Sequence, residues 1–229
     1  MVRTLRPIMM MTLISGVCYA LDTTEPFDSG FSDLEFYAGY AGLDDPSSRS
    51  EVSFETLLGA GLTESFSAFV TVSVSSDGYL DQSEDHQGMG LFWTAVEGEW
   101  LDLDLYGSTG TGGGVSIGTE INCDLNGWGL QLNAEETVEN AGPGERTFST
   151  ALQPLAYCRF SGGLELLGAL DLLYDDSQDG GYELDWSAFS AGVNFPIIES
   201  IEGITQFDVI NSGEDEIETG ISVGIVAGV

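Results

Sequence analysis

Apolar and polar residues alternate along most of this chain with the two-residue period of β-strands. The clearest example is the segment 115–134, in which apolar side chains recur at every second position on both sides of residues 124–127. Those four residues read Asp-Leu-Asn-Gly, a turn-forming sequence that ends in glycine. Alternation on both sides of such a turn predicts a β-hairpin with one apolar and one polar face.

The same pattern recurs from residue 34 onward and predicts twelve strands. In chain order the expected strands cover residues 34–40, 52–60, 66–74, 89–95, 101–106, 115–123, 128–134, 148–156, 164–172, 182–195, 203–209 and 217–229. Within 182–195 the apolar positions change from even to odd numbers, which predicts a β-bulge near Ser187. Pro154 lacks an N–H and is expected to interrupt the hydrogen-bonded ladder around it.

The connections between these segments alternate in length along the chain. Those after odd-numbered segments are polar and often long, at 44–50, 77–87, 136–145 and 175–181. Those after even-numbered segments are mostly tight, at 61–63, 97–99, 124–127 and 159–162. Long connections at one end and tight turns at the other are typical of bacterial outer-membrane barrels.

The two faces of the expected strands differ in charge. On eleven strands the apolar face carries no charged residue, whereas the opposite face carries the carboxylates of Glu35, Glu55, Asp102, Asp104, Glu120, Glu135, Glu165, Asp171, Glu202, Asp208 and Glu218. A closed soluble barrel with the apolar face inside fails on volume, because side chains fill the interior of only about eight strands. The pattern predicts an all-β, up-and-down antiparallel transmembrane β-barrel of about twelve strands, with those eleven residues lining a wet lumen. A soluble two-sheet sandwich remains the alternative.

Aromatic residues favour the barrel over the sandwich. They gather near both ends of the expected strands, with Trp100, Trp128, Phe160 and Phe195 toward the tight turns and Tyr40, Phe148, Tyr174 and Tyr182 toward the long connections. Two such belts are typical of membrane interfaces, whereas a sandwich would place its large aromatics in mid-strand.

Short phrases of the sequence resemble a known family. Gly61-Leu62-Thr63-Glu64 precedes an alternating strand, and Gln206-Phe207-Asp208 precedes a last strand punctuated by glycine. These phrases resemble the outer-membrane transporter family associated with aromatic-compound (phenol) degradation operons, over most of the chain. The resemblance implies a twelve-stranded barrel that moves small molecules. Such barrels usually end in an aromatic residue, and the departure at Val229 keeps the sandwich open.

The first twenty residues belong to another class of sequence. Arg3 and Arg6 precede a mostly apolar run, and Cys18 and Ala20 place small residues before a cut after Ala20, as in a secretory signal peptide. We therefore expect a signal peptide at 1–20, a flexible lead-in at 21–33 and a single β-barrel domain at 34–229. Acylation of Cys18 is the alternative, disfavoured by the bulky Val17 before it.

The chain is strongly acidic, with a formal net charge of −33 at pH 7 and no lysine. Nucleic acid and anionic lipid headgroups are therefore poor partners, because binding them requires concentrated positive charge. Adaptation to a salty habitat also accounts for acidity of this kind. Arg49 and Arg146 are expected in outer loops and Arg159 in a tight turn, which leaves no basic residue on the barrel wall.

Few residues suggest metal chemistry. Asp175, Ser177 and Asp179, followed by Gly180, match the first half of a calcium loop, but Trp186 occupies the position of the closing glutamate. A solvated loop is therefore favoured over a Ca²⁺ site, and no cofactor is expected.

The remaining reactive side chains predict no catalytic site. His86 is the only histidine and is expected in a loop without a catalytic motif around it, so no enzyme is expected. Cys123 and Cys158 fall one strand apart, at about 10 Å, which exceeds the limit of about 7 Å for a disulfide and predicts two free thiols.

Together these observations predict an outer-membrane barrel of a Gram-negative bacterium that gives passive passage to small solutes and prefers cations. Its expected partners are outer-membrane lipid and small solutes or cations, and the barrel is expected to be a monomer or a weak homo-oligomer. Gly118, Gly129, Gly220 and Gly224 on the polar face are expected to leave room in the lumen. The alternative is a secreted or periplasmic β-sandwich with a structural or adhesive role.

Overall fold

The computed structural model describes residues 32–41, 51–76, 83–111, 113–142, 145–176, 181–198, 201–211 and 217–228. These residues form twelve strands: β1 (Ser32–Ala41), β2 (Glu51–Thr63), β3 (Phe66–Ser76), β4 (Ser83–Val96), β5 (Asp102–Gly110), β6 (Val115–Asp124), β7 (Trp128–Gly142), β8 (Glu145–Arg159), β9 (Glu165–Asp176), β10 (Tyr182–Ile198), β11 (Ile201–Asn211) and β12 (Ile217–Gly228). Each expected strand has its counterpart in this series. Residues 1–31, which include the expected signal peptide, lie outside the described ranges.

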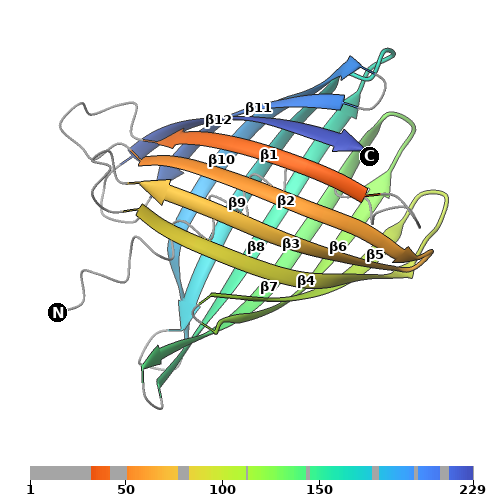
Figure 1. Cartoon of the computed structure of the whole chain (residues 1–229). Helices are drawn as coiled ribbons and strands as arrows, with labels where there is room; N and C mark the ends of the chain where they lie inside the picture. The colour runs from red at the N-terminus through yellow and green to blue at the C-terminus, as the bar shows by residue number, and fades with distance from the viewer. Residues whose placement is uncertain are drawn as a thin grey trace.

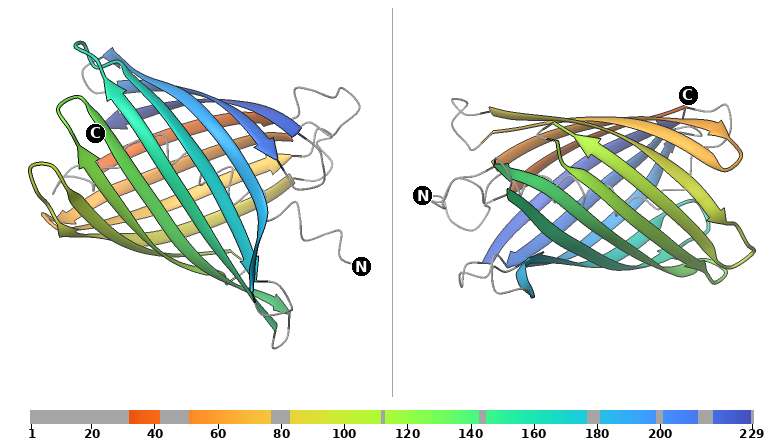
Figure 2. Two further views of the ribbon diagram at one scale, coloured as in Figure 1. Left: turned by 180° about the vertical axis from the view of Figure 1, so that it is seen from behind. Right: turned by 90° about the horizontal axis from the view of Figure 1, so that it is seen from below.

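The strands form one closed antiparallel barrel (Figures 1 and 2). Every strand pairs with its neighbours in the sequence, and β1 pairs with β12 over nine residues from Asp33↔Gly228 to Ala41↔Gly220. Closure leaves no open sheet edge to be protected. The up-and-down barrel predicted from the sequence is confirmed, and the two-sheet sandwich is excluded.

The opening hairpin shows how local sequence sets the barrel's tight turns. Leu125 N–H donates to Trp128 O at 2.8 Å, and between them Asn126 and Gly127 both have positive φ, of 58° and 97°. Two successive left-handed residues match the twist of the flanking strands, which is why Asn-Gly is favoured in such hairpins. This turn and those after β2, β4 and β8 define the tight-turn end, where β1 also begins and β12 ends.

The opposite, long-loop end differs from the expectation in two places. β4 already begins at Ser83, so His86 belongs to a strand and pairs with Ser73. β7 continues as far as Gly142, and β8 already begins at Glu145. Most of the connection expected at 136–145 is therefore strand, and Arg146 pairs with Asn140. This hairpin projects beyond its neighbours (Figure 1). Sequence reasoning missed the extension because its residues are polar on both faces, which hides the two-residue period.

Two irregularities in the ladder match the sequence. The register between β9 and β10 shifts between Leu184 and Trp186, two residues before the predicted bulge. At Pro154 the pairing of β8 with β9 is interrupted between Leu152↔Leu172 and Leu155↔Ala169, as expected for a residue without an N–H.

Large apolar side chains cover the outside of the barrel. Ile117, Met89 and Leu130 are 68%, 61% and 51% exposed, although each lies within a strand. The aromatic belts are also present, and Trp93 joins the tight-turn belt by stacking on Phe66 with ring centroids 6.2 Å apart. An apolar surface of this extent marks a membrane or partner interface on a folded protein.

Outside the expected strand ranges, charged residues interrupt this outer face at the long-loop end, where Asp85, Glu136, Arg146 and Asp176 occupy outward register positions. Glu136 lies on the outer face of the extended β7, where it accepts hydrogen bonds from Tyr182 Oη at 2.8 Å and Thr150 Oγ1 at 2.5 Å. Tyr182 belongs to the aromatic belt at the long-loop end, so the carboxylate is held at the rim of the apolar zone.

Within the described ranges, no helix has the length and apolar character needed to cross a membrane.

Candidate functional site

The barrel's inner face is the candidate site, because the register brings the expected lumen carboxylates to it. Opposite residues of an antiparallel pair point to the same side, and Asp104↔Glu120 and Glu120↔Asn133 form one such series. By register or by burial the inner face holds Glu35, Glu55, Asp102, Asp104, Glu120, Glu135, Glu165, Asp171, Glu202, Asp208 and Glu218. Of Glu35 and Glu218 only the backbone position is described.

These carboxylates do not share one environment. Glu55, Asp104, Glu120, Glu165 and Asp171 are buried at 3–6% exposure, whereas Glu202 near a tight turn is exposed. Asp102 is engaged locally, since its Oδ1 accepts the Gly98 N–H at 3.0 Å and so holds the turn before β5.

A chain of side-chain hydrogen bonds crosses the inner face from β7 to β10. Gln131 donates to Asn133 at 3.1 Å, and Asn133 donates to Gln153 Oε1 at 3.0 Å. Gln153 donates in turn to Asp171, whose second oxygen accepts from Ser190 Oγ at 3.2 Å. The Asp171 carboxylate is therefore held by neutral donors. Sequence reasoning passed over these amides, although they recur at alternate positions among the acids.

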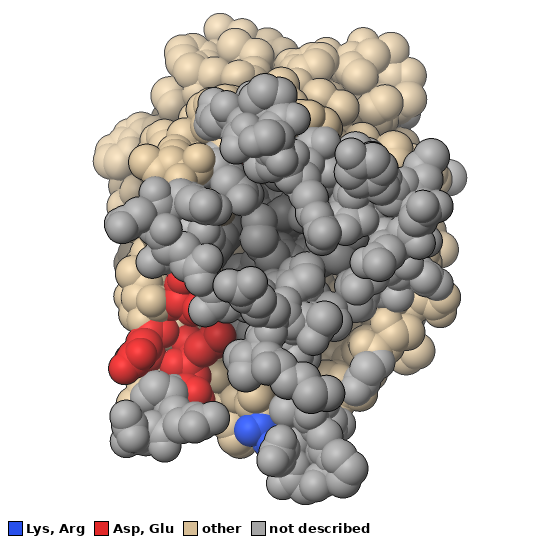
Figure 3. All heavy atoms as spheres, turned by 90° about the vertical axis from the view of Figure 1, so that its left-hand side faces the viewer, with Lys and Arg blue, Asp and Glu red and all other residues tan. Residues whose placement is uncertain are grey.

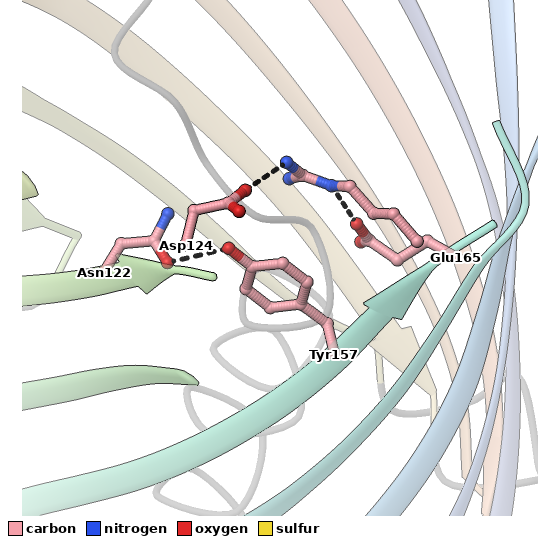
Figure 4. A network of polar contacts seen from close by, with 5 residues as sticks. Asn122, Asp124, Tyr157 and Glu165 are labelled. Carbon is pink, nitrogen blue, oxygen red and sulfur yellow. Dashed lines mark hydrogen bonds and ion pairs between the residues drawn. The ribbon is translucent and has the colours of Figure 1, made fainter. Parts of the chain in front are cut away.

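Arg159 contradicts the expectation that no basic residue lies on the wall. It is the last residue of β8, and its side chain forms ion pairs with Glu165 and, at 3.1 Å, with Asp124 Oδ2. Its guanidinium carbon lies 4.8 Å from the centroid of the Tyr157 ring, and Tyr157 Oη donates to Asn122 Oδ1 at 3.1 Å. Figure 4 shows this network at the tight-turn end.

Arg159 was expected in a tight turn, but β8 continues one residue past Cys158 and includes it. Its alternation with inward-facing Tyr157 puts the arginine on the inner face, beside the first inner residue of β9. One positive charge thus compensates two of the wall's carboxylates at this end.

Two of the inner-face glycines that were expected to leave room in the lumen are covered by aromatic rings. The rings of Tyr106 and Tyr157 lie over Gly118 and Gly129 so closely that a Cβ at either glycine would meet the ring. These two glycines therefore make room for tyrosine rings along the wall and not for solute. Phe69 lies over Gly90 in the same way.

The inner face also carries apolar side chains that the sequence analysis did not single out. Leu155, Leu167 and Ala169 pack with Tyr157 in one buried cluster, and a second cluster contains Leu173, Ala188 and Ile210. The alternation hid them because residues of strand β9 are apolar on both faces over most of its length. The wall of the barrel is therefore amphipathic.

An acidic patch marks the mouth at the long-loop end. Figure 3, which faces this end, shows the described Asp and Glu side chains gathered on one side of the opening, with a small basic area beside them. Glu139 and Asp185 lie close enough to Asp175 to interact electrostatically.

The other residues singled out from the sequence give no site. Asp175 belongs to β9, while Ser177 and Asp179 lie outside the described residues, so the calcium loop is not described. Among the described residues, no group of three or more His, Cys, Asp and Glu side chains is arranged to hold a metal ion. Cys123 and Cys158 are both free, and β7 lies between them, as predicted.

Comparisons with known proteins agree with this architecture. No protein-family model matches the chain, and no curated protein matches it in sequence. Among solved structures, the NanC porin matches with a TM-score of 0.67 at 7% identity, over 85% of this chain and 98% of that one. The KdgM porin gives 0.63 at 8% identity, with coverage of 85% and 98%. An outer-membrane channel from Pseudomonas putida F1 gives 0.62 at 13% identity, with coverage of 91% and 98%. The chain therefore has the fold of outer-membrane porins and channels.

Proposed function

We propose that this protein is an outer-membrane channel that gives passive passage to small solutes and prefers cations. The observation that carries the proposal is the charge of the inner face, where at least eleven carboxylates share the described wall with one described arginine, Arg159. Rings of acidic side chains select cations in pores, and a confined wall focuses their field. The apolar outer face and its aromatic belts support residence in a membrane.

The electrostatics have two regimes along the barrel. At the tight-turn end Arg159 compensates Glu165 and Asp124. On β5 and β6, Asp104 and Glu120 lie directly opposite each other, without an arginine in the described ladder positions beside them. We therefore assign the cation preference to the section around Asp104 and Glu120 and to the acidic mouth, and not to the network of Arg159.

Reversal potentials in planar bilayers under a KCl gradient test the proposal. Wild-type protein is expected to favour K⁺ over Cl⁻, and more strongly at low salt, because the Debye length falls from about 10 Å at 0.1 M to about 3 Å at 1 M. The double variant Asp104→Asn/Glu120→Gln is expected to lose part of this preference. Its matched control is Glu136→Gln, an isosteric change of a carboxylate on the outer face.

Two results contradict the proposal. One is anion preference, or no preference at low salt, in the wild type. The other is an equal loss of cation preference in Glu136→Gln and in the double variant, since an outer-face charge does not line the conduction path.

A further inference from the structure

The inner face of β3, β4 and β5 carries an aromatic stripe made of Phe69, Phe92 and Tyr106. The ring centroids of Phe69 and Phe92 are 5.2 Å apart and those of Phe92 and Tyr106 are 5.3 Å apart, each pair tilted by 45°. All three side chains are half-buried, so each keeps part of its surface toward the barrel interior. The stripe is therefore accessible from inside the barrel.

Two glycines leave the space in which the two end rings of this stripe lie along the wall. Phe69 lies over Gly90 of β4, and Tyr106 lies over Gly118 of β6, at positions where any Cβ would meet the ring. The Tyr106 hydroxyl reaches past that glycine to hydrogen-bond Glu135 of β7. An aromatic surface three strands wide thus ends at a carboxylate.

Further carboxylates lie along the same surface. Asp104 precedes Tyr106 by two residues on the inner face of β5, and Glu120 lies opposite Asp104 on β6. Asp104 is only 4% exposed, its described hydrogen-bonding neighbour is the neutral hydroxyl of Thr94 directly opposite it on β4, and no described positive charge faces it. Burying a carboxylate without an opposite charge is costly, and a ligand that brings positive charge would relieve that cost.

The described arginines do not supply that charge. Arg159 is held at the tight-turn end by Asp124 and Glu165, and Arg146 lies in the extended part of β8 toward the long-loop end. The surface beside the stripe therefore combines ring faces with negative charge.

We propose that this surface binds organic ammonium ions and makes them the solutes that the channel favours. The preferred transport of these ions rests on the proposed function, whereas their binding rests on the geometry of the surface alone. Aromatic faces attract an ammonium group through the ring quadrupole, and the neighbouring carboxylates add charge attraction. A neutral aromatic solute gains nothing from the carboxylates, and an anionic solute is repelled by them.

Equilibrium dialysis of the full chain in zwitterionic micelles tests binding without requiring conduction. The probe is benzyltrimethylammonium, compared with benzyl alcohol, which lacks the charge, and tetramethylammonium, which lacks the ring. We expect the first to bind more tightly than either. Phe92→Leu should weaken its binding by about three- to thirtyfold, the range of cation–π interactions converted to affinity.

The matched control is Phe189→Leu, the same change at an outer-face residue that is 56% exposed, and it should leave binding unaltered. Folding of each variant is checked by the mobility shift of unboiled samples on SDS gels. Phe69→Leu replaces Phe92→Leu if the latter does not fold, and the comparison of the three probes on wild-type protein decides the matter without any variant.

The outcomes separate this inference from the proposed function. Benzyltrimethylammonium binding no tighter than benzyl alcohol binding, or binding unaffected by loss of Phe92, overturns the inference even if K⁺ conduction is cation-selective. Selective binding without conductance supports the ammonium site and contradicts the channel proposal. Selective binding together with benzyltrimethylammonium permeating more readily than K⁺ supports both.

Discussion

Single side chains on the inner face determine both its charge and its shape. Arg159 shows the first effect, since one guanidinium holds Asp124 and Glu165, from the ends of two other strands, while it stacks on Tyr157. Gly118 shows the second, because the missing Cβ is what lets the Tyr106 ring lie along the wall. Neither residue carries out chemistry, yet each sets what a solute would meet.

Replacing Arg159 with glutamine should destabilise the barrel and raise its cation preference. The arginine side chain is 37% exposed, but Glu165 is only 7% exposed and would be left without its cation. We expect a loss of about 1–3 kcal/mol, between the values for exposed and buried pairs. Urea unfolding followed by tryptophan fluorescence measures the first effect, and reversal potentials measure the second. Arg146→Gln, at the exposed and opposite end of β8, serves as control, and a lower cation preference in Arg159→Gln would contradict our assignment.

Introducing a methyl group at Gly118 should cost about 1–3 kcal/mol, the usual penalty for overpacking. The new Cβ meets the Tyr106 ring, which must leave the wall. Gly168→Ala is the matched control, since its nearest neighbour lies at an ordinary 3.9 Å. In the double variant Gly118→Ala/Tyr106→Val the penalty for the alanine should largely vanish. Equal penalties with and without the ring would show that the contact is not its cause.

At the scale of elements, each strand separates two environments with a period of two residues. On β3 the outward Val70 is 49% exposed, whereas the inward Ser67 is 1% exposed. Two residues of one strand, one on each face, can therefore test the two environments with the same substitution. Charged residues at outward positions, such as Glu136, lie where the strands extend toward the long-loop end.

Val70→Arg should cost about 2–4 kcal/mol and impair assembly, because it places a charge on the lipid face near mid-strand. Ser73→Arg, three residues further along β3, points inward and lies directly opposite Glu55. It should be tolerated, since lumen-facing substitutions change selectivity more than stability. Yield of the heat-modifiable form in membranes compares the two variants. Equal yields would mean that the outer face of β3 is not embedded in lipid.

The whole molecule depends on closure between its first and last strands. That pairing joins residues nearly two hundred positions apart, and it converts an amphipathic sheet into a tube with an apolar outside. The acidic inner face is then enclosed, which is the basis of the proposed selectivity.

A disulfide across the closing seam tests this pairing. In a background lacking Cys123 and Cys158, Ala38→Cys and Val223→Cys lie directly opposite each other on β1 and β12. Opposite antiparallel residues have Cα atoms about 4.5–5.5 Å apart, within the range for a disulfide. We expect a crosslink in intact, unreduced protein by mass spectrometry. The pair Ala38→Cys and Ile221→Cys is offset by two residues and should crosslink poorly, and equal crosslinking of both pairs would contradict the register.

By itself the sequence determined the number of strands, their order and the direction of each face. It could do so because the alternation is local, and because turns such as Asn126-Gly127 are specified by the residues within them. The positions of the eleven carboxylates on the polar face could be predicted for the same reason. Where the period vanished, as on the extended β7–β8 hairpin with its outward Glu136, local pattern failed and the boundaries were wrong.

Only the tertiary structure decided which inner-face side chains meet. Arg159 finds Asp124 from the end of β6, and Tyr106 reaches Glu135 across an intervening strand, through distances that depend on register and strand tilt. The closing pair β1–β12 likewise has no local signal, since it joins the two ends of the described chain. The physical reason is that hydrogen-bonded closure and cross-strand contacts are properties of the assembled sheet, whereas alternation and turn type are properties of a few adjacent residues.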